Sequence, residues 1–427
     1  MNTPVIDFVK KYSESDFSRL HMPGHKGKNI LGFEQLDITE IKGADSLFEA
    51  DGIIAESEKN ASILFGTRKT LYSTEGSSLC IRTMLALVNG EKKRILASRN
   101  SHKAFIYGCA LLDMDIDWLF DESDTFSLCR CEISPETLEK KLAQYDELPC
   151  AVYVTSPDYL GNMLDIKSLA DVAHKFGLPL LVDNAHGAYL HFLDKKLHPM
   201  DLGADMCCDS AHKTLPVLTG GAYLHINNEK YCDKAKSMMS VFASTSPSYL
   251  ILQSLDYTNK LLDESFAQML NDCIKKMNEL KNCVDNTIIS DPLKLTVQGS
   301  GIAEKMREHG IECEYSDPDY TVMMFSPFNS DDDFEKVKRF FSNNSFVKSC
   351  NNLKLPVPEK RLNVRDAIFT DSELVDVCDA VGRVCASPVV GCPPAVPVVV
   401  SGEIISEQAV EVFKYYGIDK CFINKNS

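Results

Sequence analysis

The sequence predicts an α/β protein: a large domain on a mainly parallel sheet, followed by a small C-terminal α+β domain. From about residue 57 to 226, amphipathic helical stretches alternate with short apolar runs, a pattern typical of parallel strands joined by crossover helices. At 427 residues, the chain also exceeds the length at which one hydrophobic core keeps growing. We therefore expect an N-terminal arm over residues 1–56, the large domain over 57–285 and the small domain over 286–427.

Within the large domain, the apolar runs are expected to be strands and the amphipathic stretches helices. Asn89-Gly90 and Gly177 each follow such a stretch and are typical helix ends. The expected strands are Arg94–Ala97, Asp115–Leu119, Cys150–Thr155, Pro179–Val182, Asp205–Cys208 and Gly221–Ile226. The expected helices are Gly76–Val88, His102–Leu112, Pro135–Tyr145 and Asp165–Phe176.

The segments on either side of this pattern differ from it. Residues 1–56 are rich in Gly, Pro and Asp and have little core of their own, so they should lie on another surface. A long helical stretch covers Pro247–Val284, and shorter elements such as Tyr320–Phe325 and Asp333–Phe341 follow it. Residues 389–400 contain too many prolines for a central strand, which predicts an edge or a rigid extended connection.

The composition, 44% hydrophobic and 25% charged, is that of an ordinary globular protein. A net charge of −16 disfavours nucleic acid and anionic membranes as partners, because both bind basic surfaces. No signal-like segment or long apolar stretch is visible, so we expect a cytoplasmic protein without a membrane partner. The 16 cysteines should then be reduced thiols, and without a C-x-x-C pair we expect no metal site.

A lysine follows one expected strand, in the segment Ser210-Ala-His-Lys-Thr-Leu-Pro216. Ser210 and His212 flank Lys213 ahead of a Thr-Gly-Gly turn, and small polar groups so placed can hold a phosphate. Desolvation and neighbouring cations lower the pKa of an amine, which lets it attack an aldehyde near neutral pH. Lys213 is therefore a candidate Schiff-base lysine, with an ordinary exposed lysine as the alternative.

Asp183 ends another apolar run, at the edge where open α/β sheets bind ligands. A carboxylate there can keep the pyridine nitrogen of pyridoxal phosphate (PLP) protonated, which makes the ring an electron sink. The stretch Tyr72-Ser-Thr-Glu-Gly-Ser-Ser78 offers hydroxyls and helix N–H groups to a phosphate, and His102 could stack on the ring. The alternatives are an Asx turn at Asp183 and simple helix caps at the other two places.

These motifs occur in the same order in the short-form Orn/Lys/Arg decarboxylases, which the chain resembles from about Thr3 to Glu403. Between residues 260 and 355, the likeness is only general. The shared motifs are S-x-H-K-T-L-P around Lys213, V-D-x-A-H-G around Asp183, R-N-S-H-K around His102, H-M-P-G-H-K-G at 21–27, S-T-S-P-S-Y at 244–249 and P-P-A-V-P…G-E at 393–403. The resemblance implies a fold-type I, aspartate-aminotransferase-like PLP enzyme.

The resemblance also implies a role for each matching residue. Lys213 would carry PLP as a Schiff base, Asp183 would pair with the pyridinium nitrogen, and His102 would stack on the ring. Ala185 would lie against the other ring face, and Thr155 near the ring's 3-hydroxyl. The phosphate would be held by Ser73, Thr74, Gly76, Ser210 and His212.

The implied reaction is decarboxylation of arginine, lysine or ornithine in polyamine-type metabolism; which of the three is used stays open. Lys213 and His212 are candidate catalytic proton donors to Cα. Asp45 and Glu403 are candidate partners for the substrate's cationic end and Arg365 for its α-carboxylate, with a solvated acidic face and a surface ion pair as alternatives. The family's active site lies at a dimer interface, which implies a homodimer or a higher even oligomer.

The chain departs from the family pattern near these motifs. Ser77 stands where S-T-x-G-N has Asn, and Asn184 and Tyr189 stand where V-D-E-A-H-G-A-H has Glu and His. Two alternatives therefore stay open: another fold-type I reaction, by an aminotransferase or lyase, and a catalytically silent paralogue that acts as a regulatory subunit. Retention of Lys213 argues against the silent subunit.

Overall fold

The computed structural model describes residues 1–123, 127–288, 291–348, 351, 353–354, 357–388 and 394–425. Contacts divide the chain into two compact units, each built from two stretches of sequence. The first comprises Met1–Val88 and Pro179–Leu270, and the second comprises Asn89–Leu178 and Asn271–Ser427. Among the described helices, none combines the length and the apolar character that a bilayer crossing requires.

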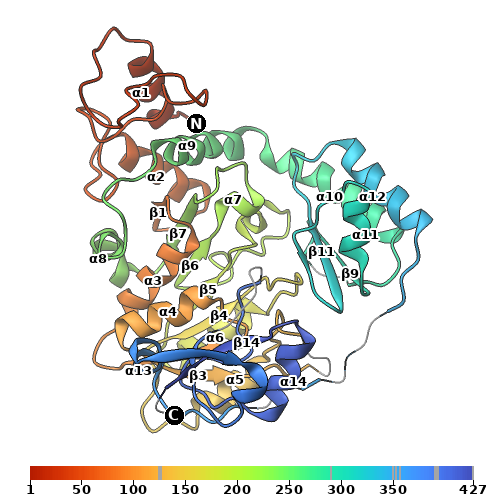
Figure 1. The fold of residues 1–427 in the computed structure, drawn as a ribbon. Coiled ribbons are helices and arrows are strands. Elements are labelled where there is room, and N and C mark those ends of the chain that lie inside the picture. The colour runs from red at the N-terminus through yellow and green to blue at the C-terminus, as the bar shows by residue number, and fades with distance from the viewer. Residues whose placement is uncertain are drawn as a thin grey trace. The chain divides into compact units, whose positions relative to one another are not determined.

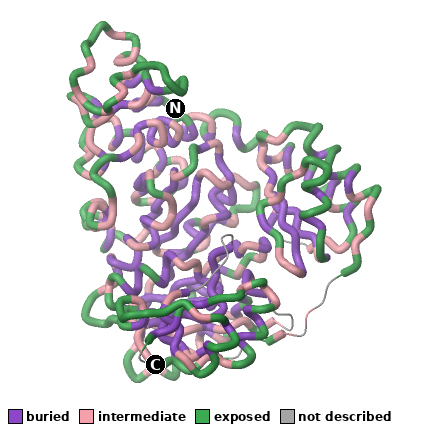
Figure 2. Tube along the Cα trace, viewed as in Figure 1, coloured by how far each residue is buried: buried purple, intermediate pink, exposed green. Residues whose placement is uncertain are grey.

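The sheet strands of the first unit lie in the order β1-β7-β6-β5. β5 and β6 are parallel, whereas β7 is antiparallel to both β6 and β1. Nearly all residues of these strands are buried, which Figure 2 shows as purple tubes, and such strands read as continuous apolar runs. The bounds are β1 Lys69–Ser73, β5 Leu180–Asp183, β6 Met206–Asp209 and β7 Ala222–Ile226.

Helices of the first unit pack around these strands and hold the N-terminal arm (Figure 1). The first helix, α1, contacts both α2 and α9. The α9 residue Asp256 accepts hydrogen bonds from the backbone N–H groups of Val5 and Ile6, which otherwise lack partners at a helix N-terminus. The bounds are α1 Pro4–Ser13, α2 Ile53–Leu64, α3 Ser77–Val88, η1 Ala188–Phe192, α7 Ala211–Thr214, α8 Glu229–Ser240, α9 Tyr249–Glu264 and, continuing into the second unit, α10 Phe266–Asn282.

In the second unit, β2 (Arg94–Ser98) is parallel to both β3 (Asp115–Leu119) and β4 (Val152–Thr155). Two antiparallel sheets follow α10 in sequence, in the orders β10-β11-β9-β8 and β12-β14-β13. Their strands are β8 Thr287–Ile288, β9 Lys294–Gln298, β10 Tyr315–Ser316, β11 Tyr320–Met324, β12 Ser372–Asp376, β13 Cys385–Ser387 and β14 Lys420–Asn424. The unit's helices are α4 Lys103–Leu112, α5 Pro135–Leu142, α6 Ile166–Lys175, α11 Ile302–Glu308, α12 Asp331–Asn343, α13 Val364–Phe369, η2 Val377–Asp379 and α14 Glu407–Tyr415.

The expected strands and helices of the large domain are confirmed to within a few residues at each end. Strand β1 was not expected, and the helical stretch Pro247–Val284 is two helices that meet at Ser265. The region after residue 286 holds two small sheets. The boundaries at 56 and 285 stay predictions, and residues 389–393 of the proline-rich segment lie outside the described residues.

A buried ion pair joins distant parts of the second unit. Arg99 follows β2 and donates hydrogen bonds of 2.7 and 2.8 Å to the two carboxylate oxygens of Glu403. It also donates to the carbonyl oxygen of Val398 at 3.1 Å. The side chains of Arg99 and Glu403 are only 6% and 5% exposed, so water screens neither charge.

We predict that Glu403→Ala lowers the free energy of unfolding by about 3–5 kcal/mol, because it leaves the Arg99 guanidinium buried without a counter-charge. Denaturant titration against the wild-type chain measures this loss. Glu373→Ala is the control, because Glu373 pairs with Arg383 at 3.5 Å on the surface and should change stability little. Equal losses in the two variants would contradict the assignment.

Candidate active site

Lys213 lies in the short helix α7, which directly follows β6. Its Nζ is 2.9 Å from Nε2 of His186, which follows β5. Because β5 and β6 are parallel, their carboxyl ends lie side by side at one sheet edge. That arrangement brings an amine from one strand end against an imidazole from the next.

Asp183 is the last residue of β5 and is buried. One carboxylate oxygen accepts a hydrogen bond from the backbone N–H of Ala185 at 3.2 Å and the Cys208 thiol at 3.6 Å. The Asx contact that the sequence left as an alternative is therefore present. A buried carboxylate and a half-buried amine thus come from the ends of two adjacent parallel strands.

The loop between β1 and α3 is a candidate anion-binding cup. The hydroxyl of Ser73 accepts a hydrogen bond from the N–H of Glu75 and donates one to the carbonyl of Gly76, which fixes the turn before α3. Gly76 has a φ of +70°, and its N–H donates to the carbonyl of Gly220 at 2.7 Å. A Cβ at Gly220 would lie 2.9 Å from the carbonyl oxygen of Thr74, so only glycine allows this close approach.

Two serine hydroxyls complete the cup. Ser210 Oγ donates to Ser77 Oγ at 2.8 Å, which joins the turn after β6 to the first residue of α3. Nδ1 of His212 contacts the carbonyl oxygen of Gly221 at 3.0 Å, so its Nε2 faces elsewhere. The first N–H groups of a helix have no partners within the helix and favour anions, so hydroxyls and helix N-terminus together suit a phosphate.

The second unit carries His102 and Thr155. Nδ1 of His102 accepts the N–H of Ala104 at 3.1 Å and caps α4, so the capping alternative is confirmed and ring stacking stays a prediction. Thr155 ends β4, and its hydroxyl is buried without a hydrogen-bond partner among the described residues. It also lines a cavity of about 440 Å³ together with Asp158 and Asn162.

The three substrate candidates already have protein partners. Asp45 accepts hydrogen bonds from backbone N–H groups of residues 46, 51, 52, 54 and 55; burial would raise the pKa of Asp45, but these bonds lower it. Arg365 donates to the carbonyls of Ala110 and Leu111 at the end of α4. Glu403 is held by Arg99. Their roles toward substrate stay predictions.

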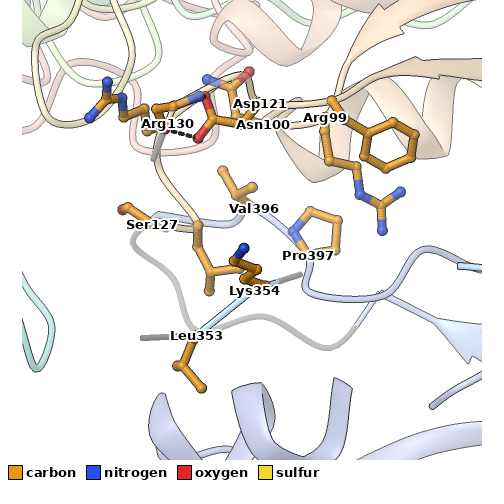
Figure 3. Close-up of a pocket in the computed structure, with 12 residues that line it drawn as sticks. Arg99, Asn100, Asp121, Ser127, Arg130, Leu353, Lys354, Val396 and Pro397 are labelled. Carbon is orange, nitrogen blue, oxygen red and sulfur yellow. Dashed lines mark hydrogen bonds between the residues drawn. The ribbon is translucent and has the colours of Figure 1, made fainter. Parts of the chain in front are cut away.

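Figure 3 shows a second pocket of the second unit, about 260 Å³ in volume. The side chains of Asn100, Asp121 and Arg130 lie along one side of it, and Val396 and Pro397 along another. None of the predicted cofactor or substrate residues is among the described residues that line it.

Behind the strand ends of the first unit lies a fully buried polar network. Asp209, the last residue of β6, accepts hydrogen bonds from Nε2 of His198 and of His225 at 3.0 and 3.1 Å. Burial would raise the pKa of Asp209, but the two histidines outweigh it and hold that pKa far below its usual value. His198, Cys207 and Asp209 lie close enough to share a metal ion, yet these hydrogen bonds already use both the ring nitrogens and the carboxylate. The prediction of no metal site stays a prediction.

Comparison with known proteins decides the family. The model of the Orn/Lys/Arg decarboxylase major domain matches residues 3–355, and that of the Orn/Lys/Arg decarboxylase C-terminal domain matches residues 348–425. The chain belongs to the Orn/Lys/Arg decarboxylase family. It is thus an amino-acid decarboxylase, and its activity is the decarboxylation of a basic amino acid.

Relatives and solved structures agree with this family. The chain is 28% identical to an arginine decarboxylase of Bacillus subtilis, over 96% of this chain and 93% of that one, and 26% identical to an arginine decarboxylase of Bacillus anthracis, over 96% and 92%. In structure it is similar to the constitutive lysine decarboxylase of E. coli, with a TM-score of 0.80, 17% identity and coverage of 99% and 82%. A serine palmitoyltransferase of Sphingomonas wittichii matches with a TM-score of 0.59 at 15% identity, over 80% and 83%. The predicted fold-type I architecture is confirmed.

The Orn/Lys/Arg decarboxylase fold implies PLP, and the residues of the first unit fit that group. PLP has an aldehyde, a pyridine nitrogen and a phosphate. The amine suits the aldehyde, the buried carboxylate suits the pyridine nitrogen, and the anion cup suits the phosphate. The role of Thr155 toward the ring's 3-hydroxyl stays a prediction.

Sequence reasoning gave no role to three residues of this site. His186 lies within the quoted V-D-x-A-H-G motif, and that motif was the signal that could have identified it. Ser77 was taken as a departure from the family, but its hydroxyl bonds Ser210. Asp209 was expected to lie just after the strand Asp205–Cys208, and no pattern in the sequence predicts its two histidine partners.

We predict that the double variant Ser77→Ala/Ser210→Ala raises the Kd for PLP about thirtyfold or more, since two hydroxyls are removed and each one lost from an anion costs about 1–3 kcal/mol. Affinity for pyridoxal, which lacks the phosphate, should change little. Equilibrium titration of the apoprotein with both compounds measures the difference. Ser240→Ala on α8 is the control, and an equal loss for PLP and pyridoxal would refute the phosphate assignment.

Proposed function

We propose that this decarboxylase carries PLP on Lys213, with Asp183 at the pyridine nitrogen and the Ser77/Ser210 cup at the phosphate. The observation that carries the proposal is the convergence of these groups at the ends of β1, β5 and β6. When bound, PLP supplies an electron sink into which the bond to the leaving carboxylate breaks. CO2 then leaves, and a proton replaces it at Cα of the product amine.

Two side chains of the protein, Asp183 and His186, would stabilise charge and transfer protons during that step. Asp183 is buried, so its negative charge is poorly screened and favours a protonated ring nitrogen. His186 lies against Nζ of Lys213 and can accept or return a proton there. We add His186 to Lys213 and His212 as a candidate proton carrier for Cα.

Arginine is the substrate we propose to test first. Two relatives that match across 96% of this chain are arginine decarboxylases, whereas the lysine decarboxylases among the solved structures are under 20% identical and support the fold alone. The amine product would serve polyamine-type metabolism. A cytoplasmic location stays a prediction.

We also propose a homodimer, supported by the apolar surface of the N-terminal arm. Between residues 14 and 34, six large apolar side chains are 45–92% exposed, far more than a free surface of this length normally shows. A second copy of the chain would cover them. The exposed side chains are Phe17, Leu20, Met22, Ile30, Leu31 and Phe33.

We predict that the wild-type chain develops a visible absorbance band with PLP and releases CO2 from arginine, and that Lys213→Ala abolishes both because it removes the attacking amine. Absorbance and CO2 release are followed together, with lysine and ornithine tested in turn. Lys195→Ala, an exposed lysine of the same unit, is the control. A wild-type band with keto-acid formation in place of CO2 would show a transaminase, and no band would refute the PLP assignment.

A second prediction concerns assembly. The double variant Leu20→Asp/Ile30→Asp should shift a wild-type dimer toward monomer at micromolar concentration, because it buries two carboxylates in the interface. Sedimentation velocity measures the shift. Val347→Asp, equally exposed but outside the arm, should leave the dimer intact. A monomeric wild-type chain would count against the proposal.

A further inference from the structure

The inference concerns a hydrogen bond at the back of the strand pair. Nδ2 of Asn184 donates to Oδ1 of Asp209 at 2.6 Å, and both residues are fully buried. Each directly follows or ends a strand that carries the active site: Asn184 comes after Asp183, and Asp209 comes before Ser210. The bond therefore ties the ends of β5 and β6 together.

This bond lies on the opposite side of the strand ends from the Asp183 carboxylate. Successive residues of an extended chain point to opposite faces. Asp183 contacts Cys208 on one face, and Asn184 contacts Asp209 on the other. The backbone supports the same tie, because the N–H of Asn184 donates to the carbonyl of Cys208 at 3.0 Å.

The rest of the buried network determines which residue of the pair donates the hydrogen bond and which accepts it. Oδ2 of Asp209 accepts from Nε2 of both His198 and His225, so Oδ1 is the oxygen left for residue 184. The other ring nitrogens also have partners: Nδ1 of His198 faces the N–H of Met200, and Nδ1 of His225 faces the Thr70 hydroxyl. The Cys207 thiol also reaches Oδ1, at 3.9 Å, and the amide of Asn184 is its short donor at 2.6 Å.

That requirement explains one departure from the family pattern. The pattern has Glu where this chain has Asn184, and a carboxylate there would face the Asp209 carboxylate inside the protein. Two anions in hydrogen-bond contact without water are strongly unfavourable. The amide of Asn184 removes this conflict.

We propose that Asn184 and Asp209 form a positioning pair, which locks the spacing between Asp183 and the segment that carries Ser210 and Lys213. Neither side chain is among the groups proposed to hold the cofactor. The inference rests on the proposed function. The spacing matters because one PLP molecule must contact both the Asp183 carboxylate and the Lys213 amine. It adds two positioning residues to the residues proposed to hold PLP.

An exchange of the two side chains tests the pair. Asn184→Asp sets two carboxylates against each other, whereas Asp209→Asn leaves two amides, in which the oxygen of Asn184 can turn toward the new N–H₂. In the double variant Asn184→Asp/Asp209→Asn, the new amide donates to Asp at 184 while its oxygen accepts from the two histidines. The exchange restores the bond between positions 184 and 209 with its polarity reversed and keeps the two histidine bonds unchanged.

We expect Asn184→Asp to raise the Kd of the apoprotein for PLP at least about tenfold, and the double variant to return it to within about threefold of wild type. Asn184→Ala, which removes the donor without adding charge, should also raise this Kd and serves if Asn184→Asp does not fold. Titration by visible absorbance measures the Kd, and the unfolding midpoint of each apoprotein is measured in parallel.

Asn424→Asp is the matched control. Asn424 is a buried asparagine of the second unit that donates to the carbonyl of Ala367 at 3.0 Å, so its variant should lower the unfolding midpoint and leave the Kd for PLP unchanged. Wild-type affinity in Asn184→Asp and Asn184→Ala, or a double variant no better than Asn184→Asp, would overturn the inference alone. A wild-type chain that binds no PLP would overturn the proposed function as well.

Discussion

The parallel pairing of β5 with β6 determines where the chemistry of the first unit lies. Asp183 stands opposite Cys208 in the ladder, so the segments that follow both strands begin at the same level. One segment carries His186 and the other carries Lys213, and the two meet. The antiparallel neighbour β7 begins just after Gly221 and so brings its preceding turn to the same edge, where it closes the anion cup.

Strands buried on both faces were predictable because their residues form uninterrupted apolar runs, as in Leu180-Leu-Val before Asp183. Strand β1 was not predictable, because Lys69-Thr-Leu-Tyr-Ser73 mixes polar and apolar residues. The hydroxyl of its buried Thr70 contacts nearby Thr67 and also His225 on β7, which comes from a distant part of the sequence. A short window of sequence carries no record of such a partner.

The residues of the candidate site divide in the same way into those that the sequence predicts and those that it does not. Lys213 and Asp183 could be predicted because reactive groups directly after apolar strands must lie at the sheet edge. The contacts of Asp45 and Arg365 could not, since an acidic or basic side chain that caps a helix is indistinguishable in sequence from one that binds a substrate. Asn184 looked like the loss of a functional group. Its contact with Asp209 makes it a matched substitution instead, which weakens the case for a silent paralogue.

The interleaving of the two units also affects how the chain can fold during synthesis. Strand β1 pairs with β7, with Lys69 opposite Ile226, so the first unit's sheet is incomplete until β7 has left the ribosome. By then β2, β3 and β4, which belong to the second unit, have already emerged and can pair among themselves. The nascent chain must therefore keep α3 and β1 unaggregated while later strands of the same seven-stranded sheet pair downstream, and β1 depends on a late-emerging partner.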